Sequence, residues 1–171
     1  NEGNLTMKKF VIDPAPQVCL PIRGSNASFP VRRIYCIGRN YADHAIEMGH
    51  NPNKEPPFFF QKNAQNVDTS GTFPYPPQTS DVHHEMELVV ALKSGGAEIS
   101  LDNALKHVYG YGLGLDMTRR DLQGEAKKLG RPWEVGKSFE KSAPMSELVP
   151  ASETGHLDQG RICLKVNGEI K

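Results

Sequence analysis

The segment from Val82 to Leu92 constrains the fold of this chain more than any other. It begins as VHHEME, where polar residues alternate with the apolar Val82 and Met86, and continues as the apolar run LVVAL. Alternation of polar and apolar residues is typical of a half-buried strand, and a short continuous apolar run is typical of a strand buried on both faces. The pattern therefore predicts one strand over 82–92 that enters a hydrophobic core from a polar opening.

The rest of the chain favours further short strands and a few short helices. Pro and Gly residues divide the first 33 residues into an extended arm with short strands. Further strands are expected at 33–38, within the PPFFFQK segment, and at 109–116, 133–139 and 160–166, and helices at 40–48, 101–107 and 119–129. A capping box of Thr118 and Asp121 is expected to begin the last helix, and VNGE is typical of a hairpin turn. Strands without regular βαβ alternation indicate an α+β fold.

Composition excludes several classes of protein. A length of 171 residues favours one main domain, and no apolar run is long enough for a transmembrane helix. Lys plus Arg and Asp plus Glu each number 20, so no charge excess favours a nucleic-acid or membrane partner. The N-terminus has no apolar secretion segment, which indicates a cytoplasmic protein.

The cysteines give no sign of a disulfide or zinc site. They number three, are far apart and include no CxxC pair. We therefore expect Cys19, Cys36 and Cys163 to be buried free thiols.

Glu85 and Glu87 are the strongest candidates for a metal site. Residues two apart on a strand leave the same face, with Cα atoms about 7 Å apart, so both carboxylates would share one site. Two like charges beside an apolar run are unfavourable unless cations neutralise them. Asp116, at the end of the glycine-rich strand, adds a third carboxylate. Three oxygen ligands suit Mg²⁺, and Mn²⁺ or Ca²⁺ less specifically, whereas a solvent-facing pair of glutamates needs no ion.

His44 and Glu47 are candidates for a general-base pair. They are three residues apart on the expected helix 40–48 and would lie on one face, where a carboxylate can orient an imidazole. The alternative is a solvated surface pair. Two other motifs indicate no nucleotide site. WEVGKS has Arg131 where a phosphate loop needs its first glycine, and GYGLG runs within an expected strand instead of opening a helix.

Taken together, these segments resemble the fumarylacetoacetate hydrolase family, especially its short acylpyruvate and fumarylpyruvate hydrolase branch. The resemblance runs from about Ile34 to the end of the chain. It rests on IGRNYADHAIEMG, PPFFFQK, DVHHEMELVVAL, GYGLGLDMTRRDLQ, RPWEVGKSFE and KVNGE, in the order of the family. It implies a mixed β-sheet roll over residues 34–171, a homodimer, and a catalytic domain without its C-terminal part.

The resemblance also implies roles for individual residues. Glu85, Glu87 and Asp116 would bind the metal, His44 with Glu47 would activate water, and Lys137 would be the catalytic cation. The residues expected to contact the substrate are Arg120 and Gln123, together with Arg39, Tyr41 and Lys62.

The implied activity is hydrolysis of a carbon-carbon bond in a small acylpyruvate-type diketo acid, giving pyruvate and a carboxylic acid. One alternative is decarboxylation or tautomerisation of oxaloacetate at the same site. A second is a non-catalytic paralogue that binds metal or carboxylate.

Overall fold

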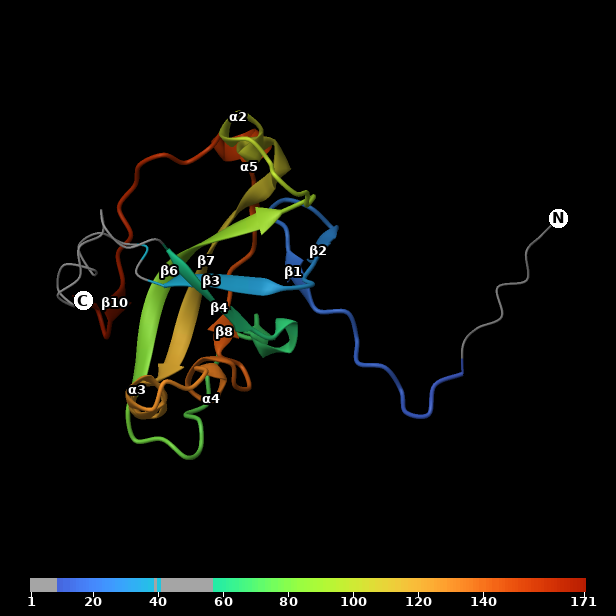
Figure 1. Cartoon of the computed structure of the whole chain (residues 1–171). Helices are drawn as coiled ribbons and strands as arrows, with labels where there is room; N and C mark the ends of the chain where they lie inside the picture. The colour runs from blue at the N-terminus through green and yellow to red at the C-terminus, as the bar shows by residue number, and fades with distance from the viewer. Residues whose placement is uncertain (1–8, 39, 41–56) are drawn as a thin grey trace.

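The computed structural model describes residues 9–38, 40 and 57–171 (Figure 1). The expected helix 40–48 lies outside the described residues apart from Asn40. Of the predicted site residues, Arg39, Tyr41, His44 and Glu47 also lie outside them.

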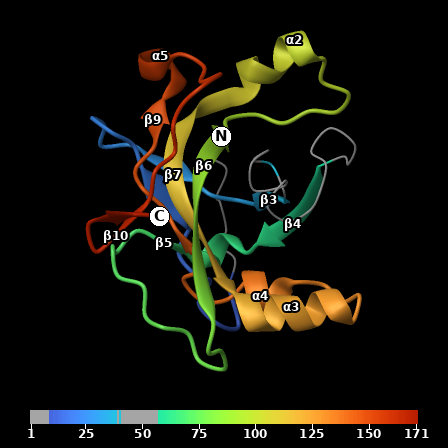
Figure 2. The ribbon, with the colours of Figure 1, turned by 90° about the vertical axis from the view of Figure 1, so that its left-hand side faces the viewer.

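A long antiparallel pair forms the centre of the molecule. Strand β6 (Val82–Leu92) pairs with β7 (Val108–Arg119), and β9 (Val149–Pro150) adds a third strand at the other edge of β7. The prediction of a strand over 82–92 is confirmed, residue for residue. Figure 2 shows β3 and β4 on one side of this pair and β9 and β10 on the other.

The remaining strands form two-stranded sheets around the central pair. Three are antiparallel and one, β5 with β8, is parallel. The pairs are β1 (Cys19–Pro21) with β2 (Ser28–Pro30), β3 (Ile34–Gly38) with β4 (Phe58–Lys62), β5 (Val67–Asp68) with β8 (Ala143–Pro144), and β10 (Lys165–Val166) with β11 (Glu169–Ile170). Small mixed sheets with a few short helices confirm the predicted α+β class.

The helices gather at the two ends of the central pair (Figure 1). At the end where β6 begins and β7 stops lie α3 (Arg120–Lys128) and α4 (Glu134–Lys137). At the opposite end lie α2 (Leu101–Ala104) with the 3-10 turn η2 (Leu105–His107), and α5 (Ala151–Thr154). A second 3-10 turn, η1 (Ala64–Asn66), follows β4. Among the residues described, every helix is too short or too polar to span a bilayer.

The hydrophobic core connects the N-terminal arm to the central sheet. Leu20 and Val31 of the arm pack with Ala91 of β6 and with Leu148, which is fully buried. Gly110 shows why β7 is rich in glycine. A Cβ atom there would lie 2.2 Å from the carbonyl oxygen of Val149, so only glycine allows β9 to approach this closely.

The strand expected at 133–139 is wrong, because this segment contains the short helix α4. The backbone N–H of Lys137 donates to the carbonyl of Trp133 at 2.8 Å, which closes a helical turn. A Cβ on Gly136 would lie 2.9 Å from the backbone nitrogen of Gln123, so α4 packs directly against α3. Tertiary packing therefore overrides the apparent alternation of apolar residues in this segment.

Three smaller expectations also need correction. The strand expected at 160–166 is reduced to Lys165–Val166. Thr118 does not cap α3, because the helix begins after Arg119 without a side-chain cap and Asp121 instead accepts a hydrogen bond from Thr79. Of the three thiols only Cys36 is partly buried, and Cys19 and Cys163 are exposed.

The hairpin expected at VNGE is confirmed. Asn167 and Gly168 both have positive φ, 52° and 86°, as a type I′ turn requires. The strands β10 and β11 flank this turn.

Candidate metal centre and active site

Three carboxylates meet on one face of the β6–β7 pair. In the strand register Glu85 lies opposite Asp116, and Glu87 lies opposite Gly114. Glu85, Glu87 and Asp116 each offer one oxygen, and these atoms all lie within 4.8 Å of one another. Asp116 is buried and the two glutamates are half-buried. The period of two along β6 thus brings the predicted ligands together.

The ammonium group of Lys137 lies among these carboxylates. Its Nζ is 2.7 Å from Asp116 Oδ2, 3.0 Å from Glu85 Oε2 and 2.6 Å from the hydroxyl oxygen of Thr118. The side chain is only 3% exposed. Helix α4 therefore places the buried ammonium of Lys137 on the face of β6 that carries the acidic residues.

Arg120 and Gln123 lie on the first turn of α3, beside Glu85. The guanidinium of Arg120 forms an ion pair with Glu85 Oε1 and donates to Gln123 Oε1 at 2.6 Å. Arg120 keeps about a quarter of its side chain exposed, 27%, whereas Gln123 is buried. A guanidinium has five N–H donors, so Arg120 retains donors for an anionic ligand.

Glu87 differs from the other two carboxylates because it has no cationic partner. Within residues 9–38, 40 and 57–171, it makes no ion pair and no side-chain hydrogen bond. Burial, followed by the charges of Asp116 and Glu85, raises the pKa of Glu87 from 4.5 to about 7. A carboxylate in such surroundings favours a cation that can share its charge.

The pKa of Glu85 moves in the opposite direction. Burial by itself would raise it, but the charges and hydrogen bonds of Lys137 and Arg120 outweigh burial and hold the pKa below 4.5. Glu85 is therefore ionised throughout the physiological pH range.

The oxygen atoms of this cluster suit a hard divalent cation. Asp116 Oδ1 lies 2.9 Å from Lys62 Nζ in an ion pair, but the angles of this contact do not make a hydrogen bond. Its lone pairs are thus not committed to a donor within the described part of the chain. Three carboxylate oxygens, with Glu87 lacking a counter-charge, match the preference of Mg²⁺, Mn²⁺ and Ca²⁺ for oxygen ligands. The residues present therefore fit a metal ion.

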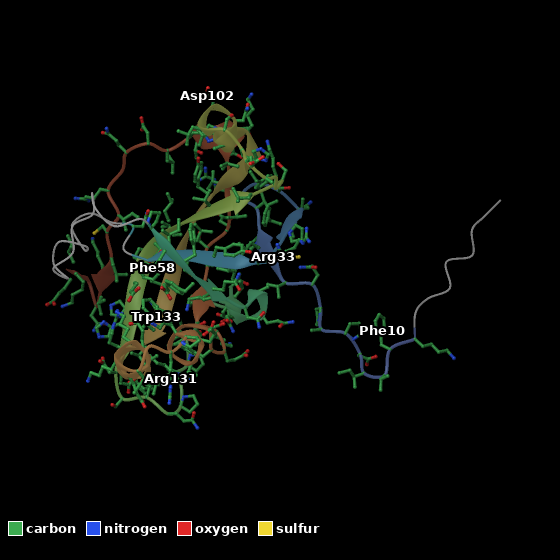
Figure 3. All side chains as sticks on the ribbon, viewed as in Figure 1. Phe10, Arg33, Phe58, Asp102, Arg131 and Trp133 are labelled. Carbon is green, nitrogen blue, oxygen red and sulfur yellow. The ribbon has the colours of Figure 1, made fainter. Side chains whose placement is uncertain are left out.

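The aromatic side chains of Phe58, Phe60 and Trp133 pack together beside this cluster. Phe58 and Trp133 lie near each other in Figure 3. Their ring centroids are 5.3 Å apart, and those of Phe60 and Trp133 are 5.7 Å apart. Lys137 Nζ lies 5.0 Å from the centre of the Phe60 ring. The Phe60 ring therefore covers one side of the Lys137 ammonium.

Strand β3 contributes Cys36, whose thiol lies near enough to feel the charges of the cluster. Burial raises the pKa of this thiol to about 12, and the charge of Asp116 adds to the shift. The thiol is therefore protonated and a poor nucleophile or metal ligand.

Sequence reasoning missed Thr118 as part of the site. Its side chain is fully buried, accepts a hydrogen bond from Lys137 and lies 3.1 Å from the backbone carbonyl of Asp116. Thr118 is two residues after Asp116 on β7, so the period of two that brought Glu85 and Glu87 together places it on the same face. That spacing was the signal that could have revealed it.

The structure thus brings together seven of the predicted site residues. They are the three carboxylates and their basic and amide neighbours, namely Lys62, Glu85, Glu87, Asp116, Arg120, Gln123 and Lys137.

Comparison with known proteins supports this arrangement. The model of the fumarylacetoacetate (FAA) hydrolase C-terminal domain matches residues 33–171. The crystal structure of fumarylpyruvate hydrolase from Pseudomonas aeruginosa, in complex with Mn²⁺ and pyruvate, superposes with a TM-score of 0.90 and 51% identity. That match covers 95% of this chain and 72% of the other.

Two relatives with different activities also match the chain. Fumarylpyruvate hydrolase from a Ralstonia species is 48% identical over 118 residues, 68% of this chain and 61% of the relative. Oxaloacetate tautomerase YcgM from Escherichia coli (strain K12) is 38% identical over 148 residues, 86% of this chain and 68% of the relative. The chain therefore spans about two thirds of the length of the curated relatives it matches.

Proposed function

Because the chain belongs to the fumarylacetoacetate hydrolase family, we propose that its protein is a divalent-metal-dependent hydrolase that cleaves a carbon-carbon bond in acylpyruvate-type diketo acids. The observation that carries the proposal is the cluster of Glu85, Glu87 and Asp116 with Lys137 Nζ among them, 2.7 Å from Asp116 and 3.0 Å from Glu85. Similarity to two fumarylpyruvate hydrolases, at 51% and 48% identity, favours fumarylpyruvate or a close analogue as substrate. The products are pyruvate and a carboxylic acid.

The charges of the cluster suit an anionic substrate. Among the described residues, three carboxylates face three basic groups, those of Lys62, Arg120 and Lys137. A bound Mg²⁺ or Mn²⁺ would polarise a carbonyl oxygen as a Lewis acid. Its two positive charges would leave this set with a net positive charge. Arg120, which is partly exposed and has spare donors, is placed to bind a substrate carboxylate.

The proposed reaction is the addition of water followed by carbon-carbon cleavage. His44, oriented by Glu47, takes a proton from water, whose oxygen attacks the carbonyl carbon distal to the pyruvate part. The bond between that carbon and the methylene carbon breaks, and its electron pair passes to the pyruvate part. A proton then adds to the former methylene carbon, which becomes the methyl group of pyruvate, and the attacked carbonyl carbon leaves as the carboxylic acid. Lys137, whose side chain is almost fully buried, stabilises the negative charge that develops.

A direct assay tests this proposal. Purified protein is incubated with fumarylpyruvate and with acetylpyruvate, with Mn²⁺ or with EDTA. Loss of the near-ultraviolet absorbance of the enol is followed, and pyruvate is measured by coupling to lactate dehydrogenase. We expect metal-dependent release of one pyruvate per substrate consumed, and loss of this activity in Lys137→Met but not in the exposed control Lys106→Met. Substrate consumption without pyruvate would contradict hydrolysis.

A second candidate function is tautomerisation or decarboxylation of oxaloacetate. It is favoured by the 38% identity to an oxaloacetate tautomerase and the 40% identity to a mitochondrial oxaloacetate decarboxylase from Dictyostelium discoideum. Neither reaction needs an activated water. The variant His44→Ala should therefore abolish hydrolysis of acylpyruvates while leaving conversion of oxaloacetate largely intact. Equal loss of both activities would mean that His44 acts on the substrate rather than on water.

A further inference from the structure

Lys62 is a buried cation that reaches the site from outside the central sheet. It is the last residue of β4, on the same face as Phe58 and Phe60, and is only 4% exposed. Strand β4 pairs with β3 and not with β6 or β7. The side chain of Lys62 therefore bridges the β3–β4 sheet and the central β6–β7–β9 sheet. Burying an ammonium group in this way is costly unless oxygen atoms surround it.

Three protein oxygens surround the ammonium of Lys62. It donates to the backbone carbonyl of Met117 at 3.0 Å and to the backbone carbonyl of Lys137, and its Nζ lies 2.9 Å from Asp116 Oδ1. An ammonium group has three N–H bonds. Two of them are used in these hydrogen bonds, and the ion pair with Asp116 Oδ1 lies within 3 Å, so in the described part of the chain the buried ammonium faces protein oxygens.

The partners of Lys62 differ in kind from those of Lys137. Within the described part of the chain, the hydrogen bonds of the Lys137 ammonium go to side chains, those of Glu85, Asp116 and Thr118. Two of the three partners of Lys62 are main-chain carbonyls. One belongs to β7, next to Asp116, and the other ends α4 at Lys137 itself.

These contacts connect β4 to β7 and to the end of α4, and in the described sheets β4 pairs with β3 instead. The last carbonyls of a helix lack partners within the helix, and Lys62 supplies one for α4. Fixing the main chain at Lys137 fixes the point from which its side chain reaches Glu85 and Asp116. Pairing with Asp116 Oδ1 at the same time fixes the orientation of a candidate metal ligand. One side chain therefore sets the spacing between a ligand and the catalytic cation.

We propose that Lys62 is a positioning residue, which holds Asp116 and the end of α4 at the spacing that metal binding and Lys137 require, and does not contact the substrate. The predicted effect of Lys62 on catalysis rests on the proposed function. The predicted effect of Lys62 on metal affinity does not.

Calorimetric titration of purified, EDTA-treated protein with Mn²⁺ alone tests the first part. Lys62→Met keeps the length of the side chain and removes all three contacts. We expect Mn²⁺ affinity to fall about 10- to 100-fold, the range typical of groups that orient metal ligands. The control Lys106→Met removes an exposed lysine whose ammonium donates to Asn103, and should leave affinity unchanged. Unchanged affinity in Lys62→Met would overturn the proposal.

Kinetics at saturating Mn²⁺ test the second part. Positioning predicts that kcat falls while KM for the diketo acid stays within about twofold, because uniform substrate binding is not affected. A rise in KM with kcat unchanged would show that Lys62 contacts the substrate, and would overturn the proposal. If the wild-type protein has no hydrolase activity, the Mn²⁺ titration still decides the positioning role, while the proposed function fails separately.

Lys62→Arg keeps the experiment decisive if Lys62→Met does not fold. Arginine retains the charge for Asp116, but its planar guanidinium cannot direct donors to the same three oxygens. We expect a folded protein whose Mn²⁺ affinity is reduced about tenfold, within the range for such groups. Full Mn²⁺ affinity in Lys62→Arg would show that charge alone is needed, and would overturn the proposed spacing role.

Discussion

Glu85 and Glu87 leave the same face of β6, two residues apart, but the structure gives them opposite surroundings. Glu85 meets Lys137 and Arg120, and its pKa lies below the ordinary value. Glu87 lies opposite Gly114, has no cationic partner among the described residues, and its pKa rises to about 7. Both side chains are half-buried, so burial does not explain the difference.

The comparison shows that a partner decides the charge of a buried carboxylate here. Lys137 and Arg120 already balance Glu85 in the protein itself, whereas Glu87 has no such partner among the described residues and would be balanced by a bound metal ion. We therefore expect the two residues to respond alike to substitution when metal is the readout, and differently when the metal-free protein is the readout. Four predictions follow this contrast from the largest expected effect to the smallest.

Metal affinity should depend on both carboxylates. Glu87→Gln and Glu85→Gln are each expected to lower Mn²⁺ affinity by more than about 100-fold, because loss of a ligand costs more than loss of a group that orients one. Calorimetric titration of each EDTA-treated variant measures this. Glu125→Gln, on the exposed face of α3, is the matched control. Wild-type affinity in Glu87→Gln would remove this residue from the ligand set.

The stability of the metal-free protein should separate the two residues. Glu85→Gln leaves Arg120 without its carboxylate and removes one of the two carboxylates that pair with Lys137, and we expect it to lower the free energy of unfolding by about 2 kcal/mol. Glu87→Gln removes an unbalanced charge and should leave stability unchanged or raise it at pH 8. Urea unfolding in the presence of EDTA provides the measurement. Equal losses in the two variants would contradict the assignment of Lys137 and Arg120 to Glu85.

The dependence of stability on pH should come from Glu87. Because its pKa in the folded, metal-free protein is raised from 4.5 to about 7, the folded state holds a proton that the unfolded state has already released. The stability that Glu87 contributes is therefore fully present below pH 4.5 and is lost as pH rises through about 7. Unfolding by urea at a series of pH values with EDTA should show this decline. The same decline in Glu87→Gln would assign it to another group.

The smallest effect is expected at Thr118, which accepts a hydrogen bond from Lys137 at 2.6 Å. Thr118→Val keeps the volume of the side chain and leaves one N–H of Lys137 without its acceptor, at a cost of about 1 kcal/mol in unfolding free energy. Urea unfolding measures this loss, and the exposed Thr72→Val is the control. A loss as small as that in Thr72→Val would mean that the hydroxyl does not contribute to holding Lys137.

Sequence patterns predicted the central strand and the acidic cluster well, because both follow from the period of two along a strand. Val82 to Leu92 shows the change from alternating to continuously apolar residues, and the structure has β6 over these residues. The spacing of Glu85 and Glu87 placed both carboxylates on one face. The roles predicted for His44, Glu47, Arg39 and Tyr41 stay predictions.

The same patterns failed where packing between distant segments decides the structure. Trp133, Val135 and Phe139 resemble the alternation of a strand, but the close approach of Gly136 to Gln123 fits α4 against α3. For Lys62 the family resemblance implied a substrate contact, which stays a prediction, and the sequence does not show which oxygens lie around its ammonium. That depends on how β4 meets β7 and the end of α4.

The sequence by itself determined the α+β class, the strand that carries the acidic residues and the chemical nature of the candidate site, because residue type and local period are properties of a short segment. The tertiary structure alone decided which carboxylate has a cationic partner, that Thr118 accepts a hydrogen bond from Lys137, and that Lys62 joins Asp116 to the end of α4. The physical reason is that ion pairs and buried hydrogen bonds depend on distances of about 3 Å between residues far apart in the chain.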